Sequence, residues 1–286
     1  MSHQSLIRHS WRSELRVLAA IAHKEWTLFR RYPSWMAAFV IWPVLFPLGY
    51  VFVGRTLGGP NGADTATFQQ LTGTSDYLSY IVIGSTLYMW LNMTLWDVGF
   101  QLRAEQMRGT LESNWLCPIP RISILLGSTI TKLGTALIFL LITVVEFWVV
   151  FGVRLWQGDV RLLLLLLLLA IASIYGIAMA FASLVLRFKE ANAMVFMVRG
   201  LFLVFCGITY PIAVMPGWMR TISAVLPLTY AIHAIRAVTL SQATFTQIWP
   251  DIQWLLVFAV VLPILGYVAF AVTERRARRS GTLGQY

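Results

Sequence analysis

The sequence predicts an all-α membrane protein with six transmembrane helices, and two observations lead to that prediction. Hydrophobic residues make up 58% of the 286 residues and charged residues only 12%, whereas a soluble domain averages about 25% charged residues. The apolar residues also form runs of roughly the 20 residues that cross the ~30 Å hydrocarbon core of a bilayer. This composition and patterning are typical of a polytopic membrane protein.

The six expected transmembrane segments are separated by polar stretches. They cover residues 35–53, 77–100, 122–151, 162–186, 194–210 and 254–272. Pro43 and Pro47 interrupt the first segment, because proline lacks the N–H group that a helix needs. The connection 54–76 is rich in Gly and Thr, so we expect a flexible loop there.

Two terminal regions flank this single transmembrane domain, which we assign to residues 34–273. In residues 1–33, apolar side chains recur at helical spacing while arginines occupy other faces. That pattern predicts an interfacial helix along the cytoplasmic leaflet, with its basic groups toward anionic membrane lipids. Residues 274–286 form a basic cytoplasmic tail.

The distribution of basic residues predicts the orientation in the membrane. The net charge is +10, and all but five of the 22 Lys and Arg residues lie in the N-terminal segment, the region 101–132, the stretch 187–199 and the tail. These regions fall on one side of the predicted topology, so both termini and the segment 101–127 are expected in the cytoplasm. The charge reflects topology, and a nucleic-acid partner is not expected.

Residues 101–127 form a polar island between the second and third expected transmembrane segments. Three apolar residues recur at a spacing of four and share one helix face: Met107, Leu111 and Trp115. Arg108 and Glu112 form a pair of opposite charge, and Pro118 and Pro120 end the helix. We therefore expect an amphipathic helix over residues 101–116 at the membrane surface. An ordinary cytoplasmic loop that is helical by chance is the alternative.

Residues 207–236 are apolar but contain Pro211, Pro216 and Pro227. Irregular backbone at membrane depth occurs only where protein or a cavity covers it, so a straight transmembrane helix is not expected here. The pattern predicts a re-entrant helical hairpin that enters from the outer face. An extracellular loop with interfacial helices is the alternative.

Four residues of this hairpin are candidates for a translocation path: Tyr210, Tyr230, His233 and Arg236. The last three are spaced by three residues and are expected to share one face of the returning helix. That face would either contact the head group of an anionic amphiphile or anchor the helix at the interface.

The two unusual segments resemble parts of the ABC-2 type transporter permeases, and the drug-export branch more than the polysaccharide branch. In the polar island the matching residues are Glu105-x-x-x-Gly109-Thr110-Leu111-Glu112, Pro118-Ile119-Pro120-Arg121 and Leu125-Leu126-Gly127. In the hairpin they are Pro216-x-Trp218, Pro227-Leu228-Thr229-Tyr230 and Arg236.

The resemblance implies the ABC-2 (type V) exporter fold and identifies residues 101–116 as a coupling helix that docks on a separate ATP-binding cassette subunit. The residues implied to make that contact are Glu105, Arg108, Gly109, Thr110, Glu112 and Trp115. The resemblance also implies a second permease copy, in a homodimer or alternatively a heterodimer, in the cell inner membrane. The apolar, aromatic-rich chain suits an amphiphilic substrate such as a drug, lipid or glycolipid.

The motifs of common catalytic sites do not occur in the sequence. It contains no phosphate-cradling GxxxxGK[ST] loop, and no HExxH, CxxC or GxSxG motif. We therefore expect a transport subunit without cofactor or metal, with ATP and Mg bound by the partner subunit. A membrane enzyme is disfavoured.

Glu146 is the charged residue that stands out within the expected transmembrane segments, because no charged residue follows it before Arg154. Charge in hydrocarbon is costly, so such groups normally face protein or water. One interpretation is that Glu146 lines the translocation path, and the other is that it bonds a neighbouring helix. An ATP-independent secondary transporter with Glu146 as its coupling site is the alternative function.

Overall fold

The computed structural model describes residues 19–20, 22–24, 26–27, 30–57, 65–97, 121–154, 157–187 and 191–279. Within these ranges all regular structure is helical, which confirms the all-α prediction there. The elements are α2 (Pro33–Leu57), α3 (Thr65–Thr72), α4 (Tyr77–Asp97), α7 (Arg121–Phe151), α8 (Val160–Arg187), α9 (Ala191–Phe205), η1 (Ile212–Val214), α10 (Gly217–Ala224), α11 (Pro227–Ser241) and α12 (Trp249–Arg279).

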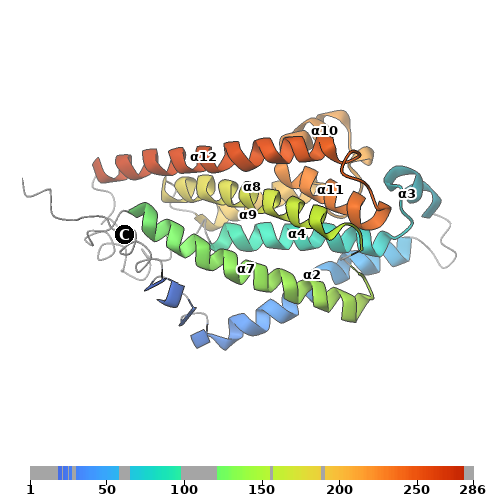
Figure 1. Cartoon of the computed structure of the whole chain (residues 1–286), viewed down its shortest axis with the longest axis horizontal. Helices are drawn as coiled ribbons and strands as arrows, with labels where there is room; N and C mark the ends of the chain where they lie inside the picture. The colour runs from blue at the N-terminus through green and yellow to red at the C-terminus, as the bar shows by residue number, and fades with distance from the viewer. Residues whose placement is uncertain are drawn as a thin grey trace, which may run out of the picture.

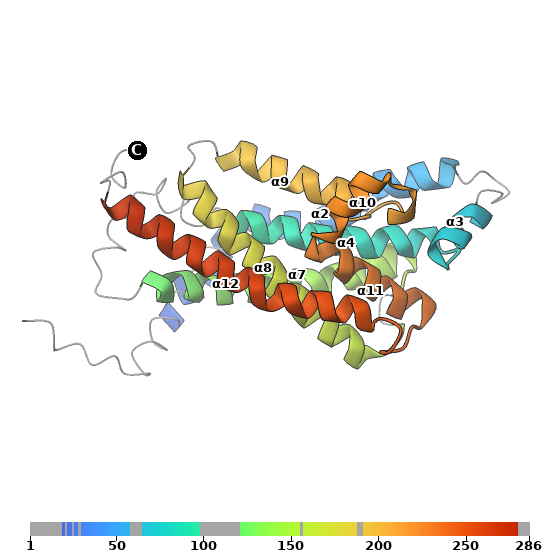
Figure 2. The same ribbon diagram turned by 90° about the horizontal axis from the view of Figure 1, so that it is seen from above.

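The long helices lie side by side along the longest axis of the molecule (Figure 1). The starts of α2 and α7 and the end of α12 lie at one end of this bundle, and α3 lies at the other. Figure 2, seen from above, shows the same arrangement, with α10 at the end that carries α3.

Each expected transmembrane segment overlaps a helix of the bundle within the described residues, although α9 already ends at Phe205. Four stretches are long and apolar enough to cross a membrane: Tyr77–Asp97, Lys132–Phe151, Val160–Leu184 and Trp249–Thr273. The bent pair of α10 and α11 makes a fifth if it is counted as one. The apolar stretches of α2 and α9 are shorter, at Met36–Phe52 and Ala193–Phe205. These helices indicate a multi-pass membrane protein.

Two local predictions are wrong. The helix α2 runs unbroken through Pro43 and Pro47, both of which are buried, so packing of that face outweighs the lost backbone hydrogen bonds. The connection predicted as a flexible loop contains α3, whose Phe68 ring packs edge-on against Tyr77 and Tyr80 at 5.1 and 5.2 Å between centroids. Aromatic contacts of this kind are enough to order a short helix on a larger one.

The helix α4 is the centre of the bundle. It is contacted by α2, α7, α8, α9 and α11, and 83% of its length is buried inside the chain. Its buried hydroxyl groups donate within the helix, from Thr86 to Val82 O at 2.8 Å and from Thr94 to Trp90 O at 2.9 Å. Bonding of this kind lets polar residues occupy a buried helix.

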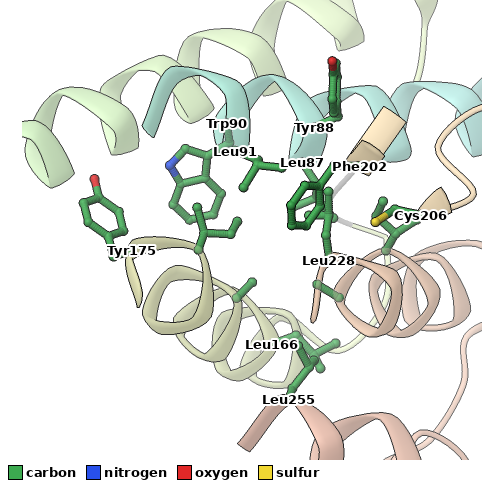
Figure 3. Close-up of a cluster of buried hydrophobic side chains, with 14 of the residues drawn as sticks. Leu87, Tyr88, Trp90, Leu91, Leu166, Tyr175, Phe202, Cys206, Leu228 and Leu255 are labelled. Atoms are coloured by element: carbon green, nitrogen blue, oxygen red, sulfur yellow. The ribbon is translucent and has the colours of Figure 1, made fainter. Parts of the chain in front are cut away.

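The main apolar cluster lies on one side of α4. Figure 3 shows Trp90 and Leu91 of α4 close to side chains of the helices that surround it. Phe202 of α9 and Leu228 of α11 lie on this side, and Leu166 of α8 lies farther away beside Leu255; all belong to the same buried cluster (Figure 3). This cluster holds the segment 207–236 against the centre of the bundle.

Glycines bring α8 and α12 together on the far side of the bundle. A Cβ at Gly176 would lie 2.5 Å from the backbone nitrogen of Pro263, and a Cβ at Gly266 would lie 2.7 Å from the carbonyl oxygen of Gly176. Small residues allow this close approach between membrane helices. Only 17% of the span of α12 is buried, so the rest of its apolar surface is free to face lipid.

Three predicted segments lie wholly or mainly outside the described residues. The coupling helix 101–116 and residues 280–286 of the tail are wholly outside. Of the predicted interfacial helix, only short pieces between Ala19 and Arg31 are described, and these are helical.

Candidate functional site

The segment 207–236 folds as a bent helical pair. After α9 the chain turns at Gly207, where φ is +64°, and continues through η1 into α10 and α11, which are bent by 91° relative to each other. Pro216 is the N-cap residue of α10, and Pro227 is the first residue of α11. A missing N–H group costs nothing at a helix start, which explains both prolines.

Tyrosine hydroxyls secure the two turns of this hairpin. Tyr210 donates to the carbonyl oxygen of Val204 near the end of α9, at 2.5 Å. Tyr230 donates to the carbonyl oxygen of Ala224, the last residue of α10, at 2.8 Å. Both bonds satisfy carbonyl groups that a helix end leaves free.

Arg236 lies inside the protein, where only 7% of its surface is exposed. Its Nε and Nη2 donate to the carbonyl oxygen of Tyr80 at 3.0 and 2.8 Å, and Nη1 donates to Gly207 O at 2.8 Å. Nη2 also donates to Ile208 O at 2.6 Å, and the guanidinium carbon lies 3.4 Å from the centroid of the Tyr80 ring. Arg236 makes no ion pair within the described part of the chain.

The prediction that Tyr230, His233 and Arg236 share one face of α11 holds only for His233 and Arg236, which border the same cavity, whereas Tyr230 does not. The Tyr230 ring stacks on Trp254 of α12 at 6.1 Å, and His233 Nδ1 lies 2.7 Å from Asp251 Oδ2 of the same helix. Arg236 points instead to α4. Steps of three residues turn a helix by less than a full circle, so the third side chain has rotated toward a different neighbour.

A cavity of about 390 Å³ lies between the α3–α4 connection, the end of α9 and α11. Tyr80, His233 and Arg236 contribute to its wall together with apolar residues such as Ile212 and Leu240. A second cavity of about 430 Å³ lies next to it, with Asp76, Arg154 and Thr239 in its wall. The hairpin therefore borders hollow space with a mixed polar and apolar lining.

Glu146 lies on α7, away from the residues that line these cavities. Both carboxylate oxygens are buried, and neither has a hydrogen-bond partner among the described residues. Buried carboxylates are normally paired. Glu146 therefore has a bonding capacity that the described part of this chain does not meet.

The central helix α4 also holds buried polar atoms of this kind. Ser85 Oγ, Trp90 Nε1 and Asn92 Oδ1 are buried without a partner among the residues that the structure describes. Buried polar atoms without a described partner therefore occur on both helices, three on α4 and the carboxylate of Glu146 on α7.

One ion pair joins these two helices where the polar island begins. Lys132 Nζ of α7 lies 3.4 Å from Asp97 Oδ1, at the last residue of α4. Sequence spacing gives no sign of this pair, because the two residues are 35 positions apart. The pair links the end of α4 to α7.

The predicted coupling residues Glu105, Arg108, Gly109, Thr110, Glu112 and Trp115 lie outside the described residues. Within the described ranges, no group of three or more His, Cys, Asp or Glu residues could hold a metal ion. Sequence reasoning missed Tyr80, Gly84, Gly207 and Asp251, which pack against or bond Arg236 and His233. Gly84 could have been found from the sequence, because a glycine inside an apolar helix often marks a close approach of another backbone.

Comparison with known families gives one match to this chain. The sequence model of the family described as ABC-2 type transporter matches residues 16–240, a range that contains both the polar island and the hairpin. No curated protein matches the chain.

Proposed function

Because the chain belongs to the ABC-2 type transporter family, as its membrane-embedded transport component, we propose that it is the permease subunit of an ATP-driven exporter. The observation that carries the proposal is the extent of the family match. It covers the expected coupling helix and the hairpin in one continuous range, 16–240. The substrate we propose is an amphiphile, namely a drug, a lipid or a glycolipid, because the cavity beside the hairpin has a mixed polar and apolar lining, which includes Tyr80, Ile212 and Arg236.

In this proposal ATP is hydrolysed by a separate ATP-binding cassette subunit, which holds ATP and Mg and docks on residues 101–116. Two permease copies form the transporter, as a homodimer or alternatively a heterodimer. Movement of the docked loop reaches α4 and α7, which the Lys132–Asp97 pair joins at the base of the loop. Because α4 is the most enclosed helix, its displacement would reorganise the packing around it.

The proposed topology has six transmembrane helices, both termini in the cytoplasm, and the hairpin 207–236 as a re-entrant element on the outer side. It rests on the excess of Lys and Arg in alternate connections. Impermeant thiol reagents should then reach Cys117 only from the cytoplasmic side. Labelling of Cys117 in intact cells would reverse the proposed orientation.

The translocation path in this proposal runs along α4 and α7 to the hairpin. Glu146 is its candidate polar residue, because its carboxylate lacks a partner among the described residues. Tyr210, Tyr230 and His233 are the candidates at the outer end, where a cavity borders the hairpin. Arg236 takes the role of holding that end together, since it is already engaged with carbonyl groups.

Charge reversal in the polar island tests the docking step. The double variant Glu105→Lys/Glu112→Lys should lose co-purification with the ATP-binding subunit, because the docking surface changes sign. Glu274→Lys reverses one carboxylate elsewhere on the proposed cytoplasmic side, which is half the net charge change, so each single variant, Glu105→Lys and Glu112→Lys, is also compared with it as the matched control. Docking is refuted if the double variant co-purifies as well as the control, or if the purified chain hydrolyses ATP alone.

A second candidate function is ATP-independent transport coupled to protons through Glu146. The unpartnered carboxylate is the observation that favours it, because intramembrane carboxylates can act in proton relays. In that case uptake of a fluorescent amphiphile should follow an imposed pH gradient without ATP, and Glu146→Gln should abolish it. Absence of gradient-driven uptake by the folded wild-type protein would remove this candidate.

A further inference from the structure

The guanidinium of Arg236 is balanced by backbone carbonyl groups and an aromatic ring. Gly207 and Ile208 lie in the turn that follows α9 after Cys206, so their carbonyl oxygens lie near the negative end of that helix. The Tyr80 ring adds its negative face. Together these contacts tie α11 to α4 and to the end of α9.

Gly84 provides an independent sign that this junction is built into the fold. A Cβ at Gly84 would lie 2.3 Å from the carbonyl oxygen of Ile208 and 2.4 Å from Arg236 Nη2. No residue with a side chain therefore fits there unless the guanidinium and the backbone after α9 shift. The helix α4 is thus shaped to receive both groups.

Cys206 belongs to the same junction. It is fully buried at the end of α9, and its thiol is within hydrogen-bonding reach of Thr229 of α11. Figure 3 shows it beside Phe202 and Leu228. We call Tyr80, Gly84, Cys206, Gly207, Ile208 and Arg236 the arginine junction.

The first half of the hairpin, residues 211–225, is held differently from α11, which forms the second half. In η1 and α10 most side chains are exposed, including Trp218 at 63% and Val225 just after α10 at 68%. The ring of Trp218 meets Phe205 of α9 at 6.1 Å, and Arg220 bonds only within the segment, to Met215 O. Displacing this half removes few buried contacts.

Moving α11 would have a much larger cost. Such a movement would break all four hydrogen bonds of the Arg236 guanidinium, which has little contact with water. Leaving a buried cation without partners is among the most unfavourable changes in a folded protein. The segment from Pro211 to Val225 can move at its two ends instead, at the turn after Gly207 and at the bend before Pro227.

We propose that Arg236 is a positioning residue that keeps α11 fixed to α4 and α9, so that the outer side opens only by movement of residues 211–225. This rests on the proposed ATP-driven function of the hairpin as the outer closure. In this proposal the hairpin does not move as one body. Its second half, α11, stays fixed, and its first half, residues 211–225, moves.

Two buried positions report separately on the two halves. Ala234→Cys, in a chain that also carries Cys206→Ala and Cys117→Ser, reports on α11, because Ala234 is fully buried and does not line the cavity that Pro211 to Ala213 border. Met215→Cys, in a chain that also carries Cys206→Ala and Cys117→Ser, reports on the mobile half, because Met215 is buried as well. An impermeant maleimide is added to the outer side of proteoliposomes that contain the full complex, with and without Mg-ATP.

The proposal expects labelling of Met215→Cys to rise during ATP turnover while Ala234→Cys stays protected. A rise at both positions would show that the hairpin moves as one body, and a rise at neither would show that residues 211–225 do not open. Both results overturn the inference. The failure of the proposed function would differ, because the complex would then hydrolyse no ATP or would not assemble.

A glycine variant tests the positioning role without removing any hydrogen-bonding group. Gly84→Ala should expose Cys206 to the maleimide even without ATP, because the added methyl displaces the guanidinium. Gly134→Ala in α7 is the matched control, since a Cβ there meets nothing within 4 Å. If Gly84→Ala folds and Cys206 stays as protected as in the control, the junction does not position α11.

Discussion

Arg236 and Glu146 each place a charged side chain inside apolar helices, and the protein treats them in opposite ways. Arg236 donates four hydrogen bonds to three carbonyl oxygens. Glu146 has no hydrogen-bond partner among the described residues, although both of its oxygens are buried. The contrast separates a side chain whose hydrogen bonds hold the fold together from a side chain whose hydrogen-bonding capacity remains open to a group outside the described residues.

The difference follows from what a helix can offer. Gly207 and Ile208 lie in the turn after α9, outside any helix, so their carbonyl oxygens are open to a cationic donor such as Arg236. Glu146 lies within α7, where the neighbouring backbone N–H groups already donate along the helix. A carboxylate there needs a side chain, water, a substrate or another subunit as its donor. This is why we assign Arg236 to the architecture and Glu146 to transport.

The largest effect is expected for loss of the Arg236 guanidinium. Arg236→Met should lower the free energy of unfolding in detergent by about 3–5 kcal/mol, because it leaves buried carbonyl groups without donors. Arg220→Met is the control, since Arg220 is exposed and makes one bond, to Met215 O at 2.8 Å. If the two variants lower the free energy of unfolding by denaturant equally, Arg236 contributes no more to stability than the exposed Arg220.

Gly84→Ala should be the next largest effect. The added methyl should destabilise the protein by about 1–3 kcal/mol, as is usual when a tight contact is overpacked. Gly134→Ala should have the opposite sign and stabilise by up to about 1 kcal/mol, because alanine is the better helix former and the position is open. Thermal unfolding of the two variants measures this, and stabilisation by both would contradict the contact at Gly84.

Glu146→Gln should change transport more than stability. Removing an unpaired charge should leave the free energy of unfolding unchanged or raise it by about 1–2 kcal/mol. Transport of a fluorescent amphiphile should fall or change in selectivity, because Gln keeps the shape and removes the charge. A clear loss of stability together with unaltered transport would show that Glu146 is structural, like Arg236.

The Lys132–Asp97 pair should have the smallest effect on stability. Both side chains are partly exposed, so a double-mutant cycle with Asp97→Asn and Lys132→Gln should give a coupling of about 0.2–1 kcal/mol. Its effect on the ratio of transport to ATP hydrolysis should be larger if the pair carries movement from the loop. A ratio unchanged in both single variants would limit the pair to a local contact.

The sequence predicted the helices better than the contacts between them. Apolar runs located α2, α4, α7, α8, α9 and α12 because burial and bilayer thickness leave a strong signal in composition. The unbroken path of α2 through Pro43 and Pro47 escaped prediction, because packing on that face overrides a local rule. The helix α3 escaped it as well, since its order comes from rings on α4.

The candidate site shows the same limit. The three prolines of the hairpin located its bends, since two of them begin helices. The partners of Arg236 could not be predicted, because they are backbone carbonyl oxygens, which every residue carries. The pairing of His233 with Asp251 and of Lys132 with Asp97 depends on helix rotation and depth, which sequence spacing does not define.

The source of energy is the central claim, and transport in inside-out vesicles tests it most directly. Vesicles that contain the chain and its ATP-binding subunit are given Mg-ATP, a fluorescent phospholipid or dye, and a protonophore that collapses the pH gradient. The account predicts that ATP-dependent transport persists in the presence of the protonophore and is lost without the ATP-binding subunit. Transport that the protonophore abolishes, and that continues without the ATP-binding subunit, would contradict it.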